Sequence, residues 1–111
     1  MGYCIICIDL GGTNLKAGIV DTCGRILHRL SIKTNSNADP QTISNQILEL
    51  IAETMRSAQI KESDVVGIGL GSPGLVDKKG ETILFSPNLP RWRNIPIKRI
   101  VSERFSKPCV L

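Results

Sequence analysis

An acidic residue and the small residues that follow it are the part of this 111-residue sequence that most directly predicts chemistry. Asp9 stands at the end of an apolar run, and Gly11, Gly12 and Thr13 come soon after it. Glycines let the backbone approach a ligand closely and turn several N–H groups toward one point, which favours an anion. The Thr13 hydroxyl would also contact a phosphate, and Asp9 would hold Mg²⁺ through water beside it. An ordinary two-glycine hairpin turn, capped by Asp9, explains the same residues equally well.

This candidate loop differs from a P-loop, which leads from a strand into a helix. The sequence contains no Gly-x-x-x-x-Gly-Lys-Ser/Thr string, and the segment after the glycines is typical of a strand. Phosphates would therefore be held by the amides of a hairpin and not by a helix N-terminus. Asn14 and Lys16 begin the returning strand and complete the candidate phosphate-binding residues.

Four cysteines are the other residues with metal-binding or redox chemistry. Cys4 and Cys7 have the spacing of half a zinc site, but they lie in a run that is typical of a strand, where residues three apart point to opposite faces. One metal ion could not take both, and no second Cys or His pair is suitably spaced. We therefore expect all four, Cys23 and Cys109 included, to be free thiols.

Basic residues are concentrated late in a chain whose net charge is +4. They surround the single tryptophan, Trp92, and are Arg91, Arg93, Lys98, Arg99, Arg104 and Lys107. Basic residues with an aromatic residue among them are typical of single-strand nucleic-acid binding. No nucleic-acid motif accompanies them, so we predict a solvated helix face, with Trp92 anchoring the preceding loop, and no nucleic-acid partner.

Length and composition indicate one small globular domain or a piece of a larger one, because 41% of the residues are hydrophobic and the chain is too short for two full domains. The longest uncharged apolar stretch, residues 2–8, is much shorter than the about 18 residues needed to cross a bilayer. The N-terminus lacks the pattern of a signal peptide. We therefore expect a cytoplasmic protein without a membrane span.

Hydrophobic periodicity predicts an α/β fold: a mixed sheet with helices on its faces. The first strand is apolar on both faces, as a central buried strand is, and the strand reached through a helix should run parallel to it. The chain ends on a strand that has only begun, so we expect a truncated domain. The predicted elements are strands 3–10, 15–20 and 25–33, a helix 40–58, a strand 65–70, a hairpin of 75–77 with 81–85, a helix that begins at 96 and stops before 108, and a strand from 109. Asp39 is the predicted N-cap of the helix 40–58, with Pro40 at its first position.

Three segments resemble the N-terminal domain of the ROK family. They are residues 9–18 (DLGGTNLKAG), residues 67–74 (GIGLGSPG), and Asn88-Leu89-Pro90 followed by a Trp and an Asn-Ile-Pro segment. That family contains bacterial glucokinases, other sugar kinases and sugar-responsive repressors. The resemblance covers essentially the whole chain, in order and at matching spacing. It implies an actin-like ATPase domain with a ribonuclease-H-like core, truncated at its last strand, in agreement with the predicted order of elements.

The resemblance also implies a role for each candidate site residue. The first phosphate-binding loop and its Mg²⁺ would involve Asp9, Gly11, Gly12, Thr13, Asn14 and Lys16, and the sugar would be bound by Gly71, Pro73, Gly74 and Asn88. A side-chain amide such as that of Asn88 offers both a donor and an acceptor to a sugar hydroxyl, and Pro87 and Pro90 stiffen its presentation. On its residues alone, Asn88 fits an ordinary turn as well.

In function, the resemblance implies that residues 1–111 are the N-terminal phosphate- and sugar-binding lobe of a two-domain, ATP-dependent hexose kinase of the glucokinase type. Sugar, ATP and Mg²⁺ would be its ligands. The general base, an Asp in an Asn-Asp pair, would come just after Leu111. The C-terminal lobe, the only place where we expect zinc, would be absent, so we expect the chain alone to be inactive. The identity of the sugar and homo-oligomerisation of the full-length protein stay open.

Two other functions fit parts of the sequence. The first is the sugar-sensing lobe of a ROK-type transcriptional regulator; such repressors carry a helix-turn-helix ahead of the loop, whereas eight residues precede Asp9 here. An intact phosphate loop also favours a kinase. The second is a nuclease of the ribonuclease-H type, which would require several carboxylates converging on metal ions near Asp9. The predicted strand at 65–70 carries no carboxylate.

Overall fold

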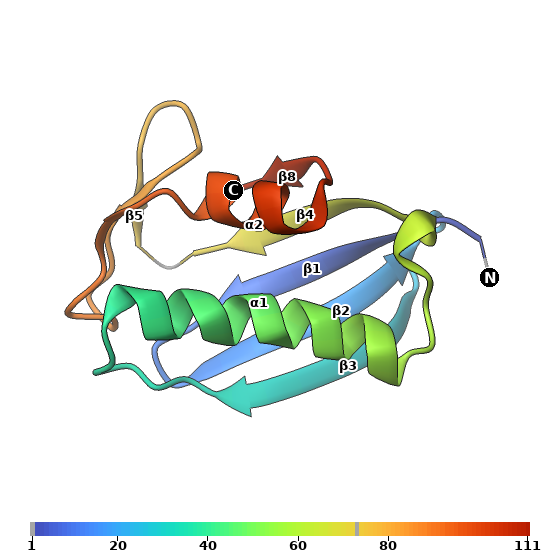
Figure 1. Cartoon of the computed structure of the whole chain (residues 1–111), viewed down its shortest axis with the longest axis horizontal. Coiled ribbons are helices and arrows are strands. Elements are labelled where there is room, and N and C mark those ends of the chain that lie inside the picture. The colour runs from blue at the N-terminus through green and yellow to red at the C-terminus, as the bar shows by residue number, and fades with distance from the viewer. Residues whose placement is uncertain (1, 73) are drawn as a thin grey trace.

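The computed structural model describes residues 2–72 and 74–111. Met1 and Pro73 lie outside the described residues. Pro73 is one of the residues expected to bind the sugar. Figure 1 shows two helices in front of a larger sheet, with a smaller group of strands at one end. The elements are β1 (Cys4–Leu10), β2 (Asn14–Asp21), β3 (Ile26–Lys33), α1 (Pro40–Ser57), the short 3-10 helix η1 (Glu62–Asp64), β4 (Val65–Gly71), β5 (Leu75–Val76), β6 (Ile83–Phe85), β7 (Arg93–Ile95), α2 (Ile97–Phe105) and β8 (Cys109–Val110).

The larger sheet has five strands in the order β3-β2-β1-β4-β8, with β1 at its centre. β2 runs antiparallel to both β1 and β3, whereas β4 runs parallel to β1 and β8 runs parallel to β4. The predicted mixed sheet is confirmed, and so is the parallel strand reached through the first helix. The last predicted strand is also present, since Cys109 and Val110 pair with Ile68 and Gly69 of β4.

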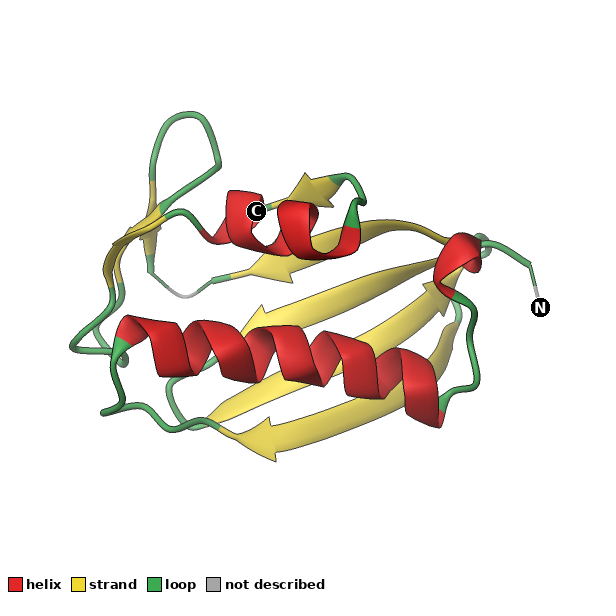
Figure 2. Ribbon diagram, in the orientation of Figure 1, coloured by secondary structure: helices red, strands yellow, loops and turns green. Residues whose placement is uncertain are grey.

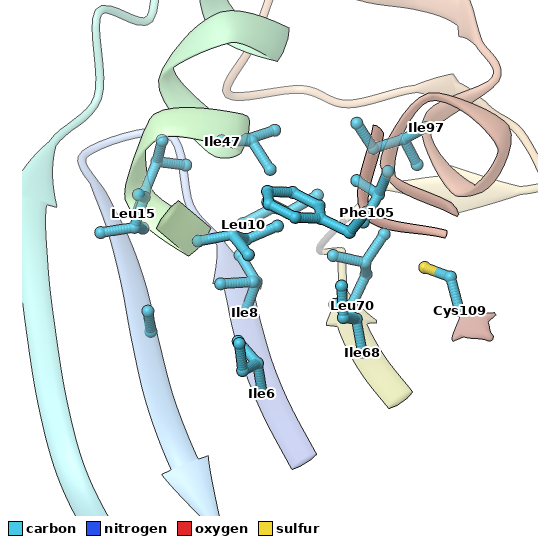
Figure 3. Close-up of a cluster of buried hydrophobic side chains, with 14 of the residues drawn as sticks. Ile6, Ile8, Leu10, Leu15, Ile47, Ile68, Leu70, Ile97, Phe105 and Cys109 are labelled. Carbon is cyan, nitrogen blue, oxygen red and sulfur yellow. The ribbon is translucent and has the colours of Figure 1, made fainter. Parts of the chain in front are cut away.

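The helices α1 and α2 lie on the same face of this sheet, and the hydrophobic core fills the space between the helices and the sheet (Figures 1 and 2). Alternate residues of β1 point into that core, where Ile6 and Ile8 are almost fully buried. Figure 3 shows them in one cluster with Ile47 of α1 and with Ile97 and Phe105 of α2. Helical spacing of apolar residues in α1 and α2 and strand alternation in β1 therefore meet in a single core.

Burial on both faces of β1 was a wrong prediction for the described residues. Burial alternates strictly along β1, and on the helix-free face Ile5 is 41% exposed, next to exposed Cys7 and Asp9. The sequence misleads here because Ile and Cys on an uncovered face have the same hydrophobicity as those in a core. The helix-free face is consequently the one that carries Asp9.

The start of α1 follows the predicted capping pattern. Asp39 is the N-cap, its side chain accepts a hydrogen bond from the Thr42 N–H at 2.8 Å, and Pro40 occupies the first turn. Hydrogen bonding to Thr42, assisted by the charge of Arg91, lowers the pKa of Asp39. The carboxylate form is therefore favoured at the helix N-terminus.

A second, three-stranded sheet has the order β5-β6-β7. Its β5–β6 hairpin was predicted, and the Asp77 side chain closes the turn by accepting a hydrogen bond from the Glu81 N–H at 2.8 Å. The third strand, β7, was missed. β7 has three residues, too few for an alternating pattern to be recognised in the sequence. Asn94 in its middle also has a φ of 54°, which is unusual for a strand. Only its pairing with β6, Ile95 opposite Ile83, makes it a strand.

Side chains of β1 confirm the prediction made for the first two cysteines. Cys4 is buried and Cys7 is exposed, so the two thiols lie on opposite faces of the sheet. Burial raises the pKa of the Cys4 and Cys109 thiols.

Among residues 2–72 and 74–111, no helix has the length and apolarity that crossing a membrane requires.

Candidate functional site

The loop between β1 and β2, residues 11–13, is a tight turn that requires glycine. The Gly11 N–H donates to the Asn14 carbonyl at 3.1 Å and closes the turn. A Cβ on Gly11 would lie 2.5 Å from that same carbonyl oxygen, a distance that real Cβ atoms do not adopt. Gly11 is therefore required because the chain approaches itself too closely here for any side chain.

Thr34, the residue after β3, holds this loop from behind. Its hydroxyl donates to the Gly11 carbonyl at 2.7 Å, and its N–H donates to the Thr13 carbonyl at 2.8 Å. Thr34 is buried, with 5% of its surface exposed. Within the described part of the chain, the N–H groups of Gly12 and Thr13 donate no hydrogen bond. The loop thus has engaged carbonyls and free amides, an arrangement suited to an anion.

Asp9 lies next to this loop, on the helix-free face of the sheet. Its partners in the strand register are Lys16 on β2 and Gly71 on β4, and all three are exposed. Asn14 is exposed on the same side of β2 as Lys16. The ion pairs found among the described residues leave both Asp9 and Lys16 unpaired. A carboxylate and an ammonium group are therefore available at the carboxyl end of β1.

A shallow cavity of about 330 Å³ opens beside Asp9 on the same face. Its lining includes Lys16, Gly18 and Arg29, and Gly18 is the partner of Arg29 in the strand register. The two cations make the surroundings of Asp9 attractive to phosphate groups.

The donor set at Asp9 fits Mg²⁺. Mg²⁺ is commonly held by one or two carboxylates together with water and substrate phosphates, and not by a full cage of protein ligands. Asp9 provides one exposed carboxylate next to free loop amides, and residues 2–72 and 74–111 contain no cluster of three metal-binding side chains. Asp9 could therefore hold the ion only together with a phosphate-bearing ligand.

The turn that carries Asn88, residues 86–90, is anchored from both of its ends. The Leu89 N–H donates to the Ser86 carbonyl at 3.2 Å, and the Trp92 N–H donates to the Leu89 carbonyl at 2.9 Å. Leu89 and Trp92 are each 1% exposed, and the Trp92 indole donates to the Pro40 carbonyl of α1 at 3.4 Å. Asn88 itself is exposed. Trp92 is thus the predicted loop anchor, and it is not available for stacking on a nucleic-acid base.

The Asn88 turn and the β1–β2 loop are in direct contact. A Cβ on Gly12 would overlap the Asn88 Cβ and would lie 2.8 Å from the Asn88 carbonyl oxygen. The β1–β2 loop belongs to the larger sheet and the Asn88 turn connects β6 and β7 of the smaller one, and both connections lie at the end of the molecule where α1 begins (Figure 1). The structure therefore brings together the residues predicted for phosphate and the Asn88 predicted for sugar.

Gly71 and Gly74, the other predicted sugar residues in the described part of the chain, lie where β4 leaves the sheet. Gly71 is the last residue of β4 and is exposed. Gly74 packs against the end of β6, so that a Cβ on it would lie 3.0 Å from the Ser86 Cα. Ser86 is buried, and its hydroxyl has no hydrogen-bond partner among the described residues. Gly74 therefore reaches the same turn as Asn88 but lies on its β6 side.

Thr34 is the functional candidate that the sequence did not indicate. A threonine just after a predicted strand is common, and nothing local distinguishes it. Its importance depends on the register that places it opposite Thr13, 21 positions earlier in the chain (34 minus 13). The sequence signal that would have indicated Thr34 is a hydrogen-bonding residue at the end of the strand that pairs with the strand following the glycine loop.

This fold defines the class of the protein. A mixed sheet with three antiparallel strands followed by parallel strands on the other side of β1, with a glycine turn between the first two strands, is the N-terminal part of an actin-like ATPase domain with a ribonuclease-H-like core. The chain belongs to the ROK family, whose sequence model matches residues 5–111.

Curated relatives of the chain include kinases and repressors. A glucokinase from Thermotoga maritima is 34% identical over 107 residues, which are 96% of this chain and 32% of that protein. A putative xylose repressor from Caldicellulosiruptor is 31% identical over 104 residues, which are 94% of this chain and 26% of that protein. The chain therefore spans about a quarter to a third of the length of these relatives.

Solved structures agree with this family. A ROK glucokinase from Streptomyces griseus, in complex with glucose and AMPPNP, superposes with a TM-score of 0.82 at 35% identity, covering 97% of this chain and 32% of that one. A ROK hexokinase from Thermus thermophilus gives a TM-score of 0.85 at 29% identity, covering 98% of this chain and 34% of that one. The fold of the described residues is thus that of the corresponding part of ROK sugar kinases.

Proposed function

We propose that residues 1–111 form the N-terminal, phosphate- and sugar-binding lobe of a two-domain, ATP-dependent hexose kinase of the glucokinase type. The observation that carries this proposal is the packing of Gly12 against Asn88. Phosphoryl transfer requires a donor phosphate and an acceptor hydroxyl to be held in line and close together. A loop with free amides in contact with an exposed side-chain amide offers two neighbouring subsites of the required chemistry.

On the phosphate side, the N–H groups of Gly12 and Thr13 and the Thr13 hydroxyl would bind the terminal phosphates of ATP. Asp9 would hold Mg²⁺ through water, and Lys16 and Asn14 would add a charge and an amide on the same side of β2. When bound, Mg²⁺ would neutralise charge that develops on the phosphates during transfer.

On the sugar side, the Asn88 amide would exchange hydrogen bonds with a sugar hydroxyl, and the bare backbone at Gly71 and Gly74 would form the floor of the site. The general base is expected just after Leu111, in an Asn-Asp pair, and the adenosine site in a C-terminal lobe. We therefore expect residues 1–111 alone to lack hexokinase activity, because they correspond to only 32% of the length of the related glucokinase from Thermotoga maritima.

A second candidate function is that of a sugar-sensing lobe in a ROK-type transcriptional regulator. The observation in its favour is the similarity to a putative xylose repressor over 94% of this chain. Such a regulator would recognise sugar through the Asn88 side of the site and would have no need of the Asp9 side. The two candidates therefore differ in what the removal of the Asp9 carboxylate does.

The deciding experiment uses the protein encoded by the complete reading frame. Glucose-dependent formation of ADP is measured for the wild type, for Asp9→Ala and for the control Glu62→Ala, which changes an exposed carboxylate at the amino end of β4, away from the carboxyl end of β1. We expect Asp9→Ala to lower turnover at least about 100-fold, with little change in sugar binding measured by calorimetry. The control should keep wild-type turnover.

Two other outcomes contradict the proposal in different ways. Unchanged turnover in Asp9→Ala would reject the assignment of the phosphate loop. A wild-type protein that binds sugar and forms no ADP would instead support the regulator. Reading the codons after Leu111 adds an independent check, since an Asn-Asp pair there is expected for the kinase.

A further inference from the structure

We propose that Thr34 is a positioning residue for phosphate binding: its hydroxyl fixes the Gly11 carbonyl and so aims the Gly12 N–H of the β1–β2 loop at the phosphate. This inference rests on the proposed phosphate role of the loop and adds a residue that the motif does not contain. Thr34 would not touch the phosphate. It would act through Gly11 and Thr13, to which it is hydrogen-bonded at 2.7 Å and 2.8 Å.

The planarity of the peptide bond turns these contacts into an orientation. In a trans peptide the C=O of one residue and the N–H of the next point in opposite directions, and the described residues contain no cis peptide bond. The Gly11 carbonyl points toward the Thr34 hydroxyl, so the Gly12 N–H, in the same peptide plane, points away from it. Thr34 therefore sets the direction of an N–H that has no partner within the described chain.

A glycine pair makes such an anchor necessary. Glycine populates more backbone conformations than any other residue, so an unanchored Gly11-Gly12 peptide could rotate and turn its carbonyl toward an incoming anion. Fixing that peptide before binding removes an ordering cost from the binding step. The contact is also protected from competing water, because Thr34 is 5% exposed.

Two substitutions separate the hydroxyl from the shape of the side chain. Thr34→Val keeps the branched shape and loses the hydrogen bond to Gly11, whereas Thr34→Ser keeps the hydroxyl and loses a methyl group. Thr54→Val is a matched control, because the buried Thr54 hydroxyl also donates to a backbone carbonyl, that of Leu50 at 2.6 Å, but within α1. The control measures the general cost of losing a buried hydroxyl–carbonyl hydrogen bond.

The experiment follows the Gly12 and Thr13 amides of the ¹⁵N-labelled protein, expressed from the complete reading frame, by NMR during titration with inorganic tripolyphosphate. We expect saturable shifts of both amides in the wild type and a Kd that is about 5–10-fold higher in Thr34→Val, the loss expected for one hydrogen bond. Thr34→Ser should stay within about twofold of the wild type, and so should Thr54→Val. Thermal unfolding of each variant, recorded alongside, shows how much stability each change removes.

Three results would overturn the inference. If Thr34→Val binds tripolyphosphate as the wild type does, Thr34 has no positioning role, while the phosphate role of the loop stands. If Thr54→Val loses as much affinity as Thr34→Val, the effect is one of general stability. If tripolyphosphate shifts the loop amides of no variant, the phosphate assignment of the loop fails and the role of Thr34 falls with it.

Discussion

The β1–β2 loop and the Asn88 turn touch each other, yet they are held in place in different ways. The loop is fixed by hydrogen bonds from its own neighbourhood, namely the Gly11–Asn14 turn and the two bonds from Thr34. The Asn88 turn is fixed by burial, with Leu89 and Trp92 inserted into the core on the far side of Asn88. Both regions contain backbone hydrogen bonds, but only the Asn88 turn is also anchored by buried side chains, those of Leu89 and Trp92.

This difference indicates how each region would respond to a ligand. In the loop the Gly11 and Thr13 carbonyls are engaged, and the Gly12 and Thr13 amides are free to bind an anion. The sugar side keeps a buried Ser86 hydroxyl that has no partner among the described residues, next to the backbone of Gly74. A buried hydroxyl without a partner costs about 1–3 kcal/mol. The sugar side is therefore the less complete of the two subsites in this chain.

The largest effect on stability is expected when the anchor of the Asn88 turn, Trp92, is removed. Trp92→Ala should lower the free energy of unfolding by about 3–5 kcal/mol, because it leaves a large cavity in the core. Trp92→Phe is the matched control; it keeps most of the packing and loses only the long indole contact to Pro40. Urea unfolding measures both. In Trp92→Phe, the amide shifts should change around Leu89 and stay constant at Gly12 and Thr13.

Equal losses in Trp92→Ala and Trp92→Phe would contradict anchoring by packing. They would assign the role of Trp92 to its indole N–H instead.

The contact between the two regions is broken by adding one methyl group. Gly12→Ala places a Cβ against Asn88, including its backbone oxygen, and should cost about 1–3 kcal/mol of stability through overpacking. Gly18→Ala is the control, because a Cβ there meets only the His28 carbonyl at 3.6 Å. It should change stability by no more than about 0.5 kcal/mol. Thermal unfolding distinguishes the two variants, since each kcal/mol corresponds to about 4–8 °C in a domain of this size.

A neutral Gly12→Ala would show that the loop and the turn do not touch in solution. The proposed adjacency of phosphate and sugar would then lose its basis.

Local patterns were sufficient to predict most of the fold. The capping of α1 by Asp39 and the turn after Asp9 depend on neighbouring residues, and both were predicted. The parallel pairing of β4 with β1 was also predicted, because a helix connects β4 to the strands before it. β7 was missed because its strand character comes from pairing with β6. The helix-free face was missed because hydrophobicity alone does not report which side of a strand is covered.

The candidate site was predictable in its residues but not in its contacts. The glycines and Asp9 form a contiguous motif, so they could be recognised together. The packing of Gly12 on Asn88 joins residues 76 positions apart (88 minus 12), and the bonds of Thr34 depend on the β2–β3 register. Such contacts are properties of the folded chain, and no spacing rule in the sequence encodes them.

A smaller effect is expected where the side chain of Asn88 is shortened and its Cβ is kept. Asn88→Ala removes the amide and retains the atom that packs on Gly12. In the protein from the complete reading frame, sugar affinity should fall by roughly 1–3 kcal/mol, because a hydroxyl is left unpaired, and nucleotide binding should stay intact. Calorimetry with glucose and with AMPPNP measures both. Equal loss of both ligands would mean that the variant is misfolded and that Asn88 does not act on the sugar alone.

The smallest effect concerns the junction of the Asn88 turn with α1, and it depends on pH. Hydrogen bonding from Thr42, with the nearby charge of Arg91, lowers the pKa of Asp39 below its ordinary value of 3.8. A carboxyl group whose pKa is lowered by folding stabilises the folded state above its unfolded pKa, and this stabilisation is lost as the pH falls through the folded pKa. Asp39→Asn can still cap the helix through its amide oxygen but does not titrate. The wild type should therefore have the higher Tm at pH 7, and its advantage should shrink as the pH falls below about 4. High salt at pH 7 should reduce the part of that advantage that comes from Arg91. A Tm difference that stays constant from pH 7 to pH 2.5 would show that the Asp39 carboxylate does not take part in holding α1 and the turn together.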